Sequence, residues 1–565
     1  MELQTRKVIK PKKNLKGPKA EILSTNLTQM QPSTSQTDEI KATVVEEDLV
    51  SELVKEVEYK TYEDFPIEDL LLYGGIDCLV TSSLAKKLVD KATEPSKYTE
   101  FVGLEDGRIG KRIISIPTIF DVYRETTHKS LDFILDLEIN GIPYDCELNR
   151  QFNTRMESQL KELDDEIFSG VGKTFNVNSG KVISELLYGE KGFEATRFTK
   201  KGEPSTDGDT IKELAKKHAD VVWLPALAKR GDIASLHRTF VRDYIDDFVK
   251  SDGKIHPRYN LHGTGSFRIS GEEPNLTQLP RPKHAYNLRQ MYGHEDGYLF
   301  IAFDFSSCEV KILGALCGDP ALLKAIEEGR DFHSVSASAM NGLDYDIFMA
   351  VLSDETHPLY KKYKEMRQYA KALTFGILYG SSPMGISLTL GITLDKAQEL
   401  INLYFSLYPR IKTYVDTTHM MAKENKYVFG PFFQRKRTYG AEEVFKRTAA
   451  YNAAMRLGQN VRVQNTASTF GLMCFSRLNE AIKRIDGRSI CTVYDSLEIL
   501  VPFERGAEAI ELGFYHLDEE PVQIFDWLKL PVGVDAEVGM NWGDAKHVRR
   551  GITQYELEEM FGKAA

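Results

Sequence analysis

"GYLFIAFDF" at residues 297–305 is the stretch that decides the fold class of this chain. A short apolar run that is rich in aromatic residues and bounded by turn residues is typical of a buried β-strand. Asp304 stands at the polar end of this predicted strand. A single Asp at a strand end is an ordinary turn residue, so Asp304 indicates chemistry only if a second carboxylate lies beside it.

A second such carboxylate occurs in "SICTVYDSLEILVP", residues 489–502. Two apolar runs flank Asp495 and Ser496, which predicts a β-hairpin with a carboxylate at its tip. If this hairpin pairs with the strand that ends at Asp304, the two carboxylates can share divalent ions. Mg²⁺ takes one or two protein carboxylates and completes its shell with water and substrate phosphates. Two ions about 4 Å apart stabilise the attacking and leaving oxygens of a phosphoryl transfer.

The segment "RQYAKALTFGILYG", residues 367–380, carries four residues spaced four apart, so in a helix they share one face: Arg367, Lys371, Phe375 and Tyr379. One interpretation is a helix that binds a phosphate chain at one end and stacks a flat ring at the other. The ordinary alternative is a surface helix with its cations in water and its aromatic rings under a neighbour. This segment alone favours the surface helix.

The composition is ordinary for a globular chain of 565 residues, with 42% hydrophobic and 27% charged residues. The net charge of −11 argues against a protein that coats nucleic acid by bulk charge, but it allows a local basic cleft. The six cysteines form no C-x-x-C pair, which argues against a zinc site and a disulfide framework. No long apolar run predicts a membrane span, and no apolar signal-peptide core opens the chain.

Three segments resemble, in order and spacing, motifs A, B and C of the family A DNA polymerases, the bacterial DNA polymerase I family. They are "DFSSCEVKILGALCGDPALL" at 304–323, "RQYAKALTFGILYG" at 367–380 and "VYDSLEI" at 493–499. Two further segments are similar to family sequences: "TGSFRISGEEPNLTQLP" at 264–280 and "RLGQNVRVQNTAS" at 456–468. One motif is moderately specific, whereas three in order are highly specific.

The resemblance covers residues 50–546. It implies an α+β fold, the right-hand polymerase fold with an antiparallel-sheet palm, helical fingers and a helical thumb. The implied order along the chain is a disordered basic and polar tail at 1–45, a remnant of the end of an exonuclease-like domain at 46–118, the thumb at 119–250, the first part of the palm at 251–330, the fingers at 331–445, the second part of the palm at 446–546 and a C-terminal extension at 547–565.

By the same resemblance, Asp304 and Asp495 are catalytic and hold two Mg²⁺ ions, with the backbone carbonyl of Phe305 as a further ligand. Arg367 and the catalytic Lys371 bind the β- and γ-phosphates of the incoming nucleotide. Phe375 packs on its sugar and base, and Tyr379 lies by the templating position. Glu309 blocks a ribose 2′ hydroxyl. The remaining implied nucleotide-binding residues are His333, Arg289 and Ser307.

The resemblance also implies a set of DNA-binding residues. Arg268, Asn460 and Gln464 line the minor groove of the primer–template, where contacts check base-pair geometry without reading sequence. Arg456 is a primer-side residue, and Tyr494 can donate a hydrogen bond to the primer. The implied partners are therefore primer–template DNA and deoxynucleoside triphosphates.

Two departures from the family pattern stand out. Motif C usually reads His-Asp-Glu, but here it reads Tyr494-Asp495-Ser496, so the third carboxylate is missing at its usual position. The proofreading exonuclease of relatives has a D-x-E and a late Y-x-x-x-D; this chain has only Tyr73 and Asp77 of the late motif. We therefore expect no proofreading by this chain alone. A separate exonuclease or processivity subunit is the alternative that stays open.

The expected activity is template-directed DNA synthesis in replication, in a compact form that resembles a bacteriophage enzyme in the host cytoplasm. Two alternatives differ in class. A single-subunit RNA polymerase has a similar palm but uses ribonucleotides, and Glu309 argues against it. A non-catalytic replication accessory would not need Asp304 and Asp495.

Overall fold

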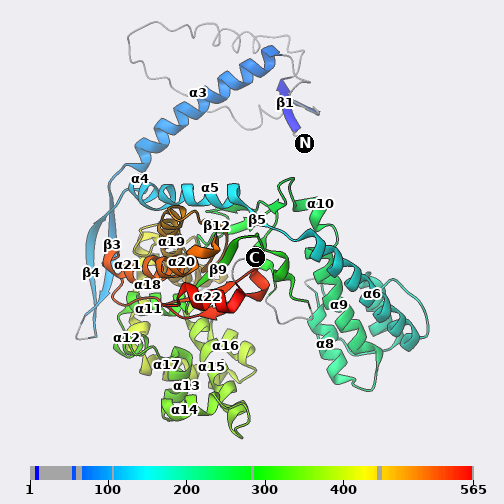
Figure 1. Ribbon diagram of the computed structural model, residues 1–565. Helices are drawn as coiled ribbons and strands as arrows, with labels where there is room; N and C mark the ends of the chain where they lie inside the picture. The colour runs from blue at the N-terminus through cyan, green and yellow to red at the C-terminus, as the bar shows by residue number, and fades with distance from the viewer. Residues whose placement is uncertain are drawn as a thin grey trace. The chain divides into compact units, whose positions relative to one another are not determined.

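The computed structural model describes residues 7–11, 54–58, 67–104, 107–199, 201–280, 286–441 and 448–562. The chain divides into two compact units, Met1–Thr93 and Glu94–Ala565. In the first unit, strands β1 (Lys7–Pro11) and β2 (Val54–Glu58) pair antiparallel, and helix α3 (Ile67–Ala92) follows (Figure 1). Apart from β1, the tail predicted at 1–45 lies outside the described residues. Tyr73 and Asp77 fall within α3.

The second unit contains a five-stranded antiparallel sheet in the order β12-β13-β9-β14-β15. Its central strand β9 is the predicted strand of the opening stretch, and β12 and β13 form the predicted hairpin. Strands β14 and β15 were not predicted. The bounds are β9 (Tyr298–Phe305), β12 (Arg488–Val493), β13 (Ser496–Pro502), β14 (Val534–Gly539) and β15 (Lys546–Val548).

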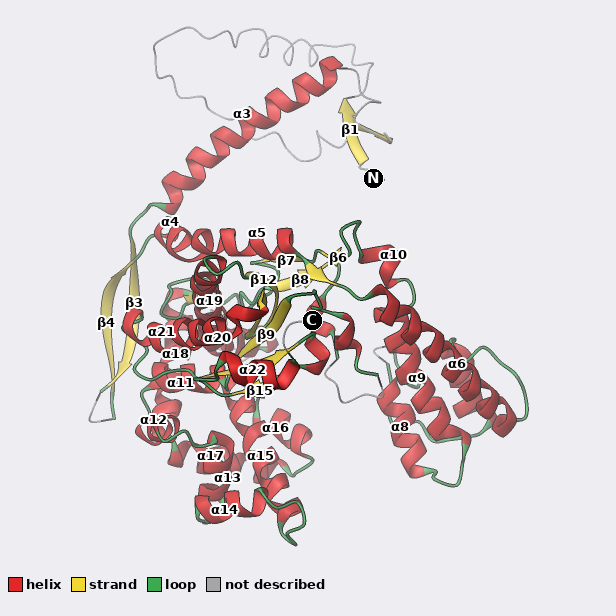
Figure 2. Cartoon of the chain, viewed as in Figure 1, coloured by secondary structure: helices red, strands yellow, loops and turns green. Residues whose placement is uncertain are grey.

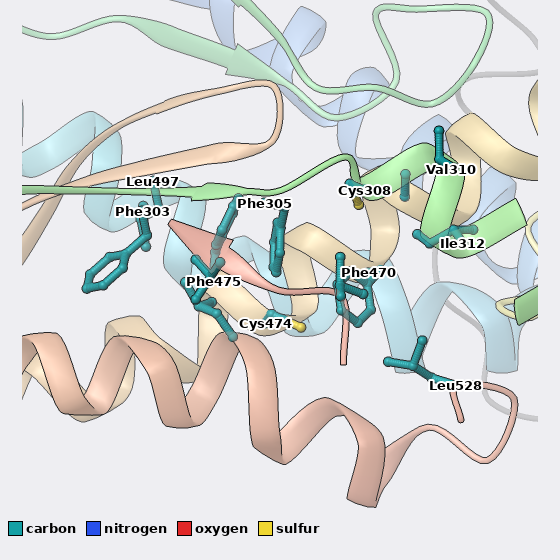
Figure 3. Packing of buried hydrophobic residues seen from close by; sticks show 14 of the residues in the cluster. Phe303, Phe305, Cys308, Val310, Ile312, Phe470, Cys474, Phe475, Leu497 and Leu528 are labelled. Carbon is teal, nitrogen blue, oxygen red and sulfur yellow. The ribbon is translucent and has the colours of Figure 1, made fainter. Parts of the chain in front are cut away.

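One face of strand β9 packs on helix α19 (Ala449–Lys483) through aromatic rings (Figure 3). The ring of Phe305 lies 5.2 Å from that of Phe470 and 5.5 Å from that of Phe475, between centroids. Phe303 projects from the same face, because alternate residues of a strand share a face. Asp304 therefore projects from the opposite face, away from the helix.

Helix α20 (Gly506–Phe514) also covers the Phe303 face of the sheet. A Cβ atom added at Gly513 would lie 2.1 Å from the ring of Phe303, so only glycine lets this helix approach so closely. The other face of the sheet buries Phe300 and Ala302. The indole ring of Trp542 stacks on Phe300 with 6.3 Å between centroids. Both faces of β9 are thus covered up to Ala302, and Asp304 is its first exposed residue beyond that point.

Helices make up most of the rest of the second unit, and Figure 2 shows them in separate groups. The predicted thumb contains α6 (Cys146–Val171), α7 (Gly180–Ser184), α8 (Gly208–Lys217), α9 (Trp223–Phe240) and α10 (Tyr244–Phe248). The predicted fingers contain α13 (Phe332–Met340), α14 (Tyr345–Leu352), α15 (Tyr360–Leu378), α16 (Pro383–Leu390), α17 (Leu394–Leu407) and α18 (Pro409–Asn425).

The second unit contains further described helices. They are α4 (Ile119–Val122), α5 (Leu131–Asn140), α11 (Cys308–Cys317), α12 (Pro320–Glu327), α21 (Glu520–Ile524) and α22 (Gln554–Phe561). Small two-stranded pairs are β5 (Ile142–Pro143) with β6 (Lys254–Ile255), β7 (Arg258–Asn260) with β8 (Ser270–Glu272), and β10 (Tyr427–Val428) with β11 (Lys436–Arg437). No described helix is long and apolar enough to cross a membrane.

A β-hairpin lies within the region predicted to be an exonuclease remnant, residues 46–118. Its strands are β3 (Ser96–Gly103) and β4 (Ile109–Ile116), and they pack on helix α18. The Asn425 side chain accepts a hydrogen bond from the Thr99 N–H at 2.9 Å and donates one to the Thr99 carbonyl at 2.8 Å. Tyr98 is buried beside Met421. The sequence did not predict this hairpin, which packs against helix α18 of the predicted fingers.

Candidate active site

Strand pairing brings the two predicted catalytic carboxylates together. Asp304 lies near the end of β9, and Asp495 lies in the turn between β12 and β13. Ser496 is directly opposite Asp304 in the sheet, and the N–H of Phe305 donates a hydrogen bond to the carbonyl of Asp495 at 3.1 Å. Tyr494, with φ of 57°, makes the tight turn that places Asp495 at this position.

The local electrostatics favour a cation at this pair. Burial raises the pKa of the Asp495 carboxyl above its ordinary value; the Arg268 charge opposes this shift and the Glu309 charge adds to it. Such a carboxylate is stabilised by a nearby positive charge. Within the described ranges, no group of three or more His, Cys, Asp or Glu residues forms a metal site. Two carboxylates suit Mg²⁺ when water and substrate phosphates supply the other ligands, so the donor set fits this ion.

Glu309, near the start of α11, is held by residues from two other motifs. Its side chain is buried, accepts a hydrogen bond from the Tyr379 hydroxyl at 2.6 Å and forms an ion pair with Arg268. The Arg268 guanidinium also lies 5.7 Å from the centre of the Tyr494 ring. Residues that were predicted from four separate segments are therefore joined through Glu309 and Arg268.

Helix α15 presents the four-residue series on one face, as predicted. Lys371 Nζ lies 5.9 Å from the centre of the Phe375 ring, and the rings of Phe375 and Tyr379 are 5.7 Å apart. Lys371 is exposed, whereas Arg367, Phe375 and Tyr379 are half-buried. The interpretation as a plain surface helix is therefore incomplete, because this face carries a continuous row of cations and rings.

Arg367 forms a two-pronged ion pair with Asp331, which the sequence did not single out. Its Nε and Nη2 atoms donate to the Asp331 carboxylate at 2.7 and 2.9 Å. Burial lowers the pKa of the neighbouring His333 to about 4; the Asp331 charge opposes this shift, and the charges of Arg367 and Lys371 add to it. The His333 ring lies 5.5 Å from the Phe375 ring. His333 is thus a neutral, buried member of the same site.

Helix α19 carries three of the predicted DNA-binding residues at four-residue steps, hence on one face. Arg456 is exposed, Asn460 is half-buried and Gln464 is buried, with a hydrogen bond to the Tyr379 hydroxyl. Gly380, with φ of 70°, ends the motif B segment against Arg456, and an added Cβ atom there would lie 3.0 Å from the Arg456 Cα atom. The Gly at the end of "ILYG" therefore allows the two helices to meet.

The two other predicted nucleotide-binding residues lie on short connections. Ser307 is exposed in the left-handed conformation, φ 55°, at the start of α11. Arg289 lies on a 3-10 helix, η6 (Leu288–Met291). Its guanidinium stacks on Trp542, 4.6 Å from the ring centre, and its charge acts on Glu498.

Glu498 is a residue that the sequence analysis missed. It lies on β13, two residues beyond Ser496, and it is buried. Burial raises its pKa to about 8; the hydrogen bond from Ser496 and the Arg289 charge oppose this shift, and the Asp304 charge adds to it. The sequence does contain a signal for this residue, because "LEILV" places one carboxylate inside an apolar run and a carboxylate is seldom fully buried unless it is paired.

Comparison with known proteins finds a family and relatives that match most of this chain. Residues 146–544 match the model of the family described as DNA polymerase family A. The DNA polymerase I of Chloroflexus aurantiacus is 26% identical over 516 residues, which span 89% of this chain and 49% of that protein. The thermostable DNA polymerase I of Thermus aquaticus is 28% identical over 427 residues, 75% of this chain and 48% of that protein. The chain thus spans about half the length of these relatives.

A solved structure shares the fold. It is the POL domain of Pol1 from M. smegmatis in complex with DNA primer-template and dNTP, with a TM-score of 0.64 and 25% sequence identity. The match covers 74% of this chain and 70% of that one. The α+β fold with its antiparallel sheet is therefore that of a polymerase domain. Because the family model matches most of its length, the chain belongs to DNA polymerase family A.

Proposed function

We propose that this chain is a template-directed DNA polymerase that adds deoxynucleotides to a primer 3′ end. The observation that carries the proposal is that strand pairing brings Asp304, which is opposite Ser496, next to Asp495, whose carbonyl accepts a hydrogen bond from the Phe305 N–H. The M. smegmatis structure, which holds primer-template and dNTP, supports the same partners for this chain. In this assignment, the sheet belongs to the palm, residues 331–445 with α13–α18 form the fingers, and residues 119–250 with α4–α10 form the thumb.

The incoming nucleotide binds between the carboxylate pair and helix α15 in this proposal. Lys371, which is exposed, contacts the phosphates, and Arg367 joins it from its ion pair with Asp331. Arg and Lys are the side chains that best neutralise phosphate oxygens. Phe375 then lies against the sugar, because its ring is the next group along the same face.

Asp304, Asp495 and the Phe305 carbonyl would hold two Mg²⁺ ions, which would supply activation of the primer hydroxyl and charge stabilisation of the leaving pyrophosphate. The protein groups position the reactants. The β9–β13 pairing fixes the carboxylates relative to each other, and Lys371 can give charge stabilisation to the transferring phosphoryl group.

Selection of deoxyribose belongs to Glu309 in this proposal. Arg268 and Tyr379 hold both of its carboxylate oxygens, so the side chain cannot swing away from a ribose 2′ hydroxyl. This arrangement favours a DNA polymerase over the RNA polymerase alternative. Arg268, Arg456, Asn460, Gln464 and Tyr494 then line the primer–template.

We further propose that this chain does not proofread alone, that it acts in the replication of a bacteriophage within the host cytoplasm, and that a separate exonuclease or processivity subunit works with it. The support is the late Tyr73 and Asp77 motif, which no D-x-E precedes in this sequence.

Primer extension tests the proposal. With Mg²⁺ and a defined template, the chain should extend a primer with dNTPs in template order and discriminate against NTPs. Glu309→Ala should raise NTP incorporation relative to dNTP, whereas Glu399→Ala, an exposed helix-surface change, should not. Equal use of both nucleotide classes by the wild type would favour the RNA polymerase alternative, and no extension at all would favour the non-catalytic accessory.

A further inference from the structure

Ser496 stands where the motif C resemblance places a third carboxylate, and the structure puts another carboxylate in contact with it. The Ser496 hydroxyl lies 2.6 Å from Oε1 of Glu498 and 3.1 Å from the carbonyl of Val493. Ser496 therefore links the turn that carries Asp495 to Glu498.

Glu498 shares the sheet face of Asp304. Ser496 is opposite Asp304 in the register, and Glu498 is opposite Ala302. Residues that are directly opposite, and those two apart along a strand, project from the same face. Glu498 thus lies one pleat repeat, about 6.6 Å, from the row that contains Asp304, toward the covered part of the sheet.

One oxygen of Glu498 is unused. The side chain is 1% exposed, and within the described part of the chain its Oε2 atom has no hydrogen-bond partner. Burying a carboxyl group without hydrogen bonds to its oxygens costs free energy, so a buried acid of this kind indicates a functional role. The charged groups that act on it are Arg289 and Asp304.

We propose that Glu498 is a positioning residue that, through Ser496, replaces the missing third carboxylate of motif C and supports divalent-ion binding at Asp304 and Asp495. This inference rests on the proposed polymerase function. Outer partners of metal ligands fix the orientation of those ligands and raise the affinity for the ion. Here, the hydrogen bond between Ser496 and Glu498 fixes the start of the strand that follows Asp495.

Glu537 provides a matched control. It is opposite Ala302 from the other side, on β14, so it occupies the same row of the sheet as Glu498. Unlike Glu498, it is half-exposed and pairs with His547 at 3.1 Å. Glu537→Gln therefore removes a carboxylate at an equivalent row, but without a link to Ser496.

The test measures Mn²⁺ binding by electron paramagnetic resonance, in complexes of each variant with a dideoxy-terminated primer–template and the next dNTP, after subtraction of binding by DNA and dNTP alone. Glu498→Gln, which keeps the size of the side chain, should weaken Mn²⁺ binding about tenfold, the usual loss for an outer partner. The Mg²⁺ concentration that gives half-maximal extension should rise by a similar factor. Glu537→Gln should bind as the wild type does.

Rescue separates a positioning role from a general structural one. Adding Ser496→Glu to Glu498→Gln returns a carboxylate to the motif C position, so Mn²⁺ affinity should recover to within about threefold of the wild type. Unchanged affinity in Glu498→Gln, equal losses in Glu498→Gln and Glu537→Gln, or the absence of rescue would overturn the inference while leaving the polymerase assignment intact. Two results together would instead overturn the proposed function, and this inference with it: the wild type does not extend primers, and Asp304→Asn binds Mn²⁺ as well as the wild type does.

Discussion

At the scale of single residues, the candidate site is built from side-chain contacts within the motif B segment and between this segment and helix α13. Phe375 is the clearest case, because its ring lies between the ring of His333 and that of Tyr379 and beneath the Lys371 ammonium group. These neighbours fix the ring on the helix face. A substitution at this position should therefore change the discrimination between nucleotide sugars without disturbing the fold.

The wild type should discriminate against dideoxynucleotides, and Phe375→Tyr should largely remove this discrimination. A normal dNTP has a 3′ hydroxyl that bonds its own β-phosphate beside the ring. A dideoxynucleotide leaves that phosphate oxygen unsatisfied, at a cost on the order of 1–3 kcal/mol, or about five- to 150-fold. The Tyr hydroxyl fills this gap. The measurement is the ratio of kcat/KM for ddNTP and dNTP in both proteins; an unchanged ratio would mean that Phe375 does not face the sugar.

The motifs predicted most of the side chains that meet in the candidate site, because the family resemblance assigns a role to each of these positions, and those roles stay predictions. They could not predict Asp331 as the partner of Arg367 or Glu498 as the partner of Ser496. Both are ordinary in sequence, a helix N-cap and a strand residue. Their significance comes from tertiary pairing, which a single sequence does not encode locally.

At the scale of elements, helix α15 and its neighbour α13 enclose a histidine whose titration ties stability to pH. His333 has a pKa of about 4 in the folded protein, against 6.5 for an ordinary histidine. Between these values the unfolded chain binds a proton that the folded chain does not. The free energy of unfolding therefore falls as the pH falls from about 6.5 to about 4.

His333→Gln should remove this pH dependence. At pH 4.5, the wild type should have lost about 2–3 kcal/mol of its neutral-pH free energy of unfolding through this residue, at 1.36 kcal/mol per pKa unit. Urea unfolding of both proteins at pH 7 and 4.5 measures the difference. The exposed His262→Gln serves as the control for the loss of any histidine. Equal pH dependence in wild type and His333→Gln would contradict the buried, neutral assignment.

The β3–β4 hairpin is held to helix α18 by Asn425, which makes two hydrogen bonds to the backbone of Thr99. Asn425→Ala would leave that N–H and carbonyl without their partner, at a cost of about 1–3 kcal/mol. Hydrogen exchange at the Thr99 amide should accelerate accordingly. Asn402→Ala, whose side chain bonds only an exposed glutamine among its described contacts, is the control. Unchanged protection at Thr99 would show that the hairpin is held by other contacts.

At the scale of the whole molecule, much of the second unit could be predicted, because motifs and long helical patterns mark it. Strand β9 and the β12–β13 hairpin were predicted from apolar runs. Strand β14 was not, since its alternation of Val, Asp, Ala and Glu is short and weak. The β3–β4 hairpin was missed because its strands carry many exposed and charged positions on both faces.

Proofreading is a property of the whole molecule. The chain alone should leave a mismatched primer 3′ end intact in Mg²⁺, because the Tyr73 and Asp77 motif lacks the acidic partners that a second metal-dependent site needs. Release of mononucleotides from a mismatched primer measures this activity. Steady release that Asp77→Ala abolishes would contradict the expectation. Release that begins only after a second polypeptide is added would support a separate exonuclease subunit.

The central claim is that Asp304 and Asp495 together hold the catalytic ions, and single-turnover incorporation of one dNTP tests it most directly. Asp304→Asn and Asp495→Asn should each lower the rate about 100-fold or more, with little change in primer–template affinity, because charge stabilisation is the largest catalytic contribution. Asp535→Asn removes a charge directly opposite Asp304 on β14 and should have a far smaller effect. A rate above about a tenth of wild type in either ligand variant, roughly 1.4 kcal/mol of barrier, would contradict the account.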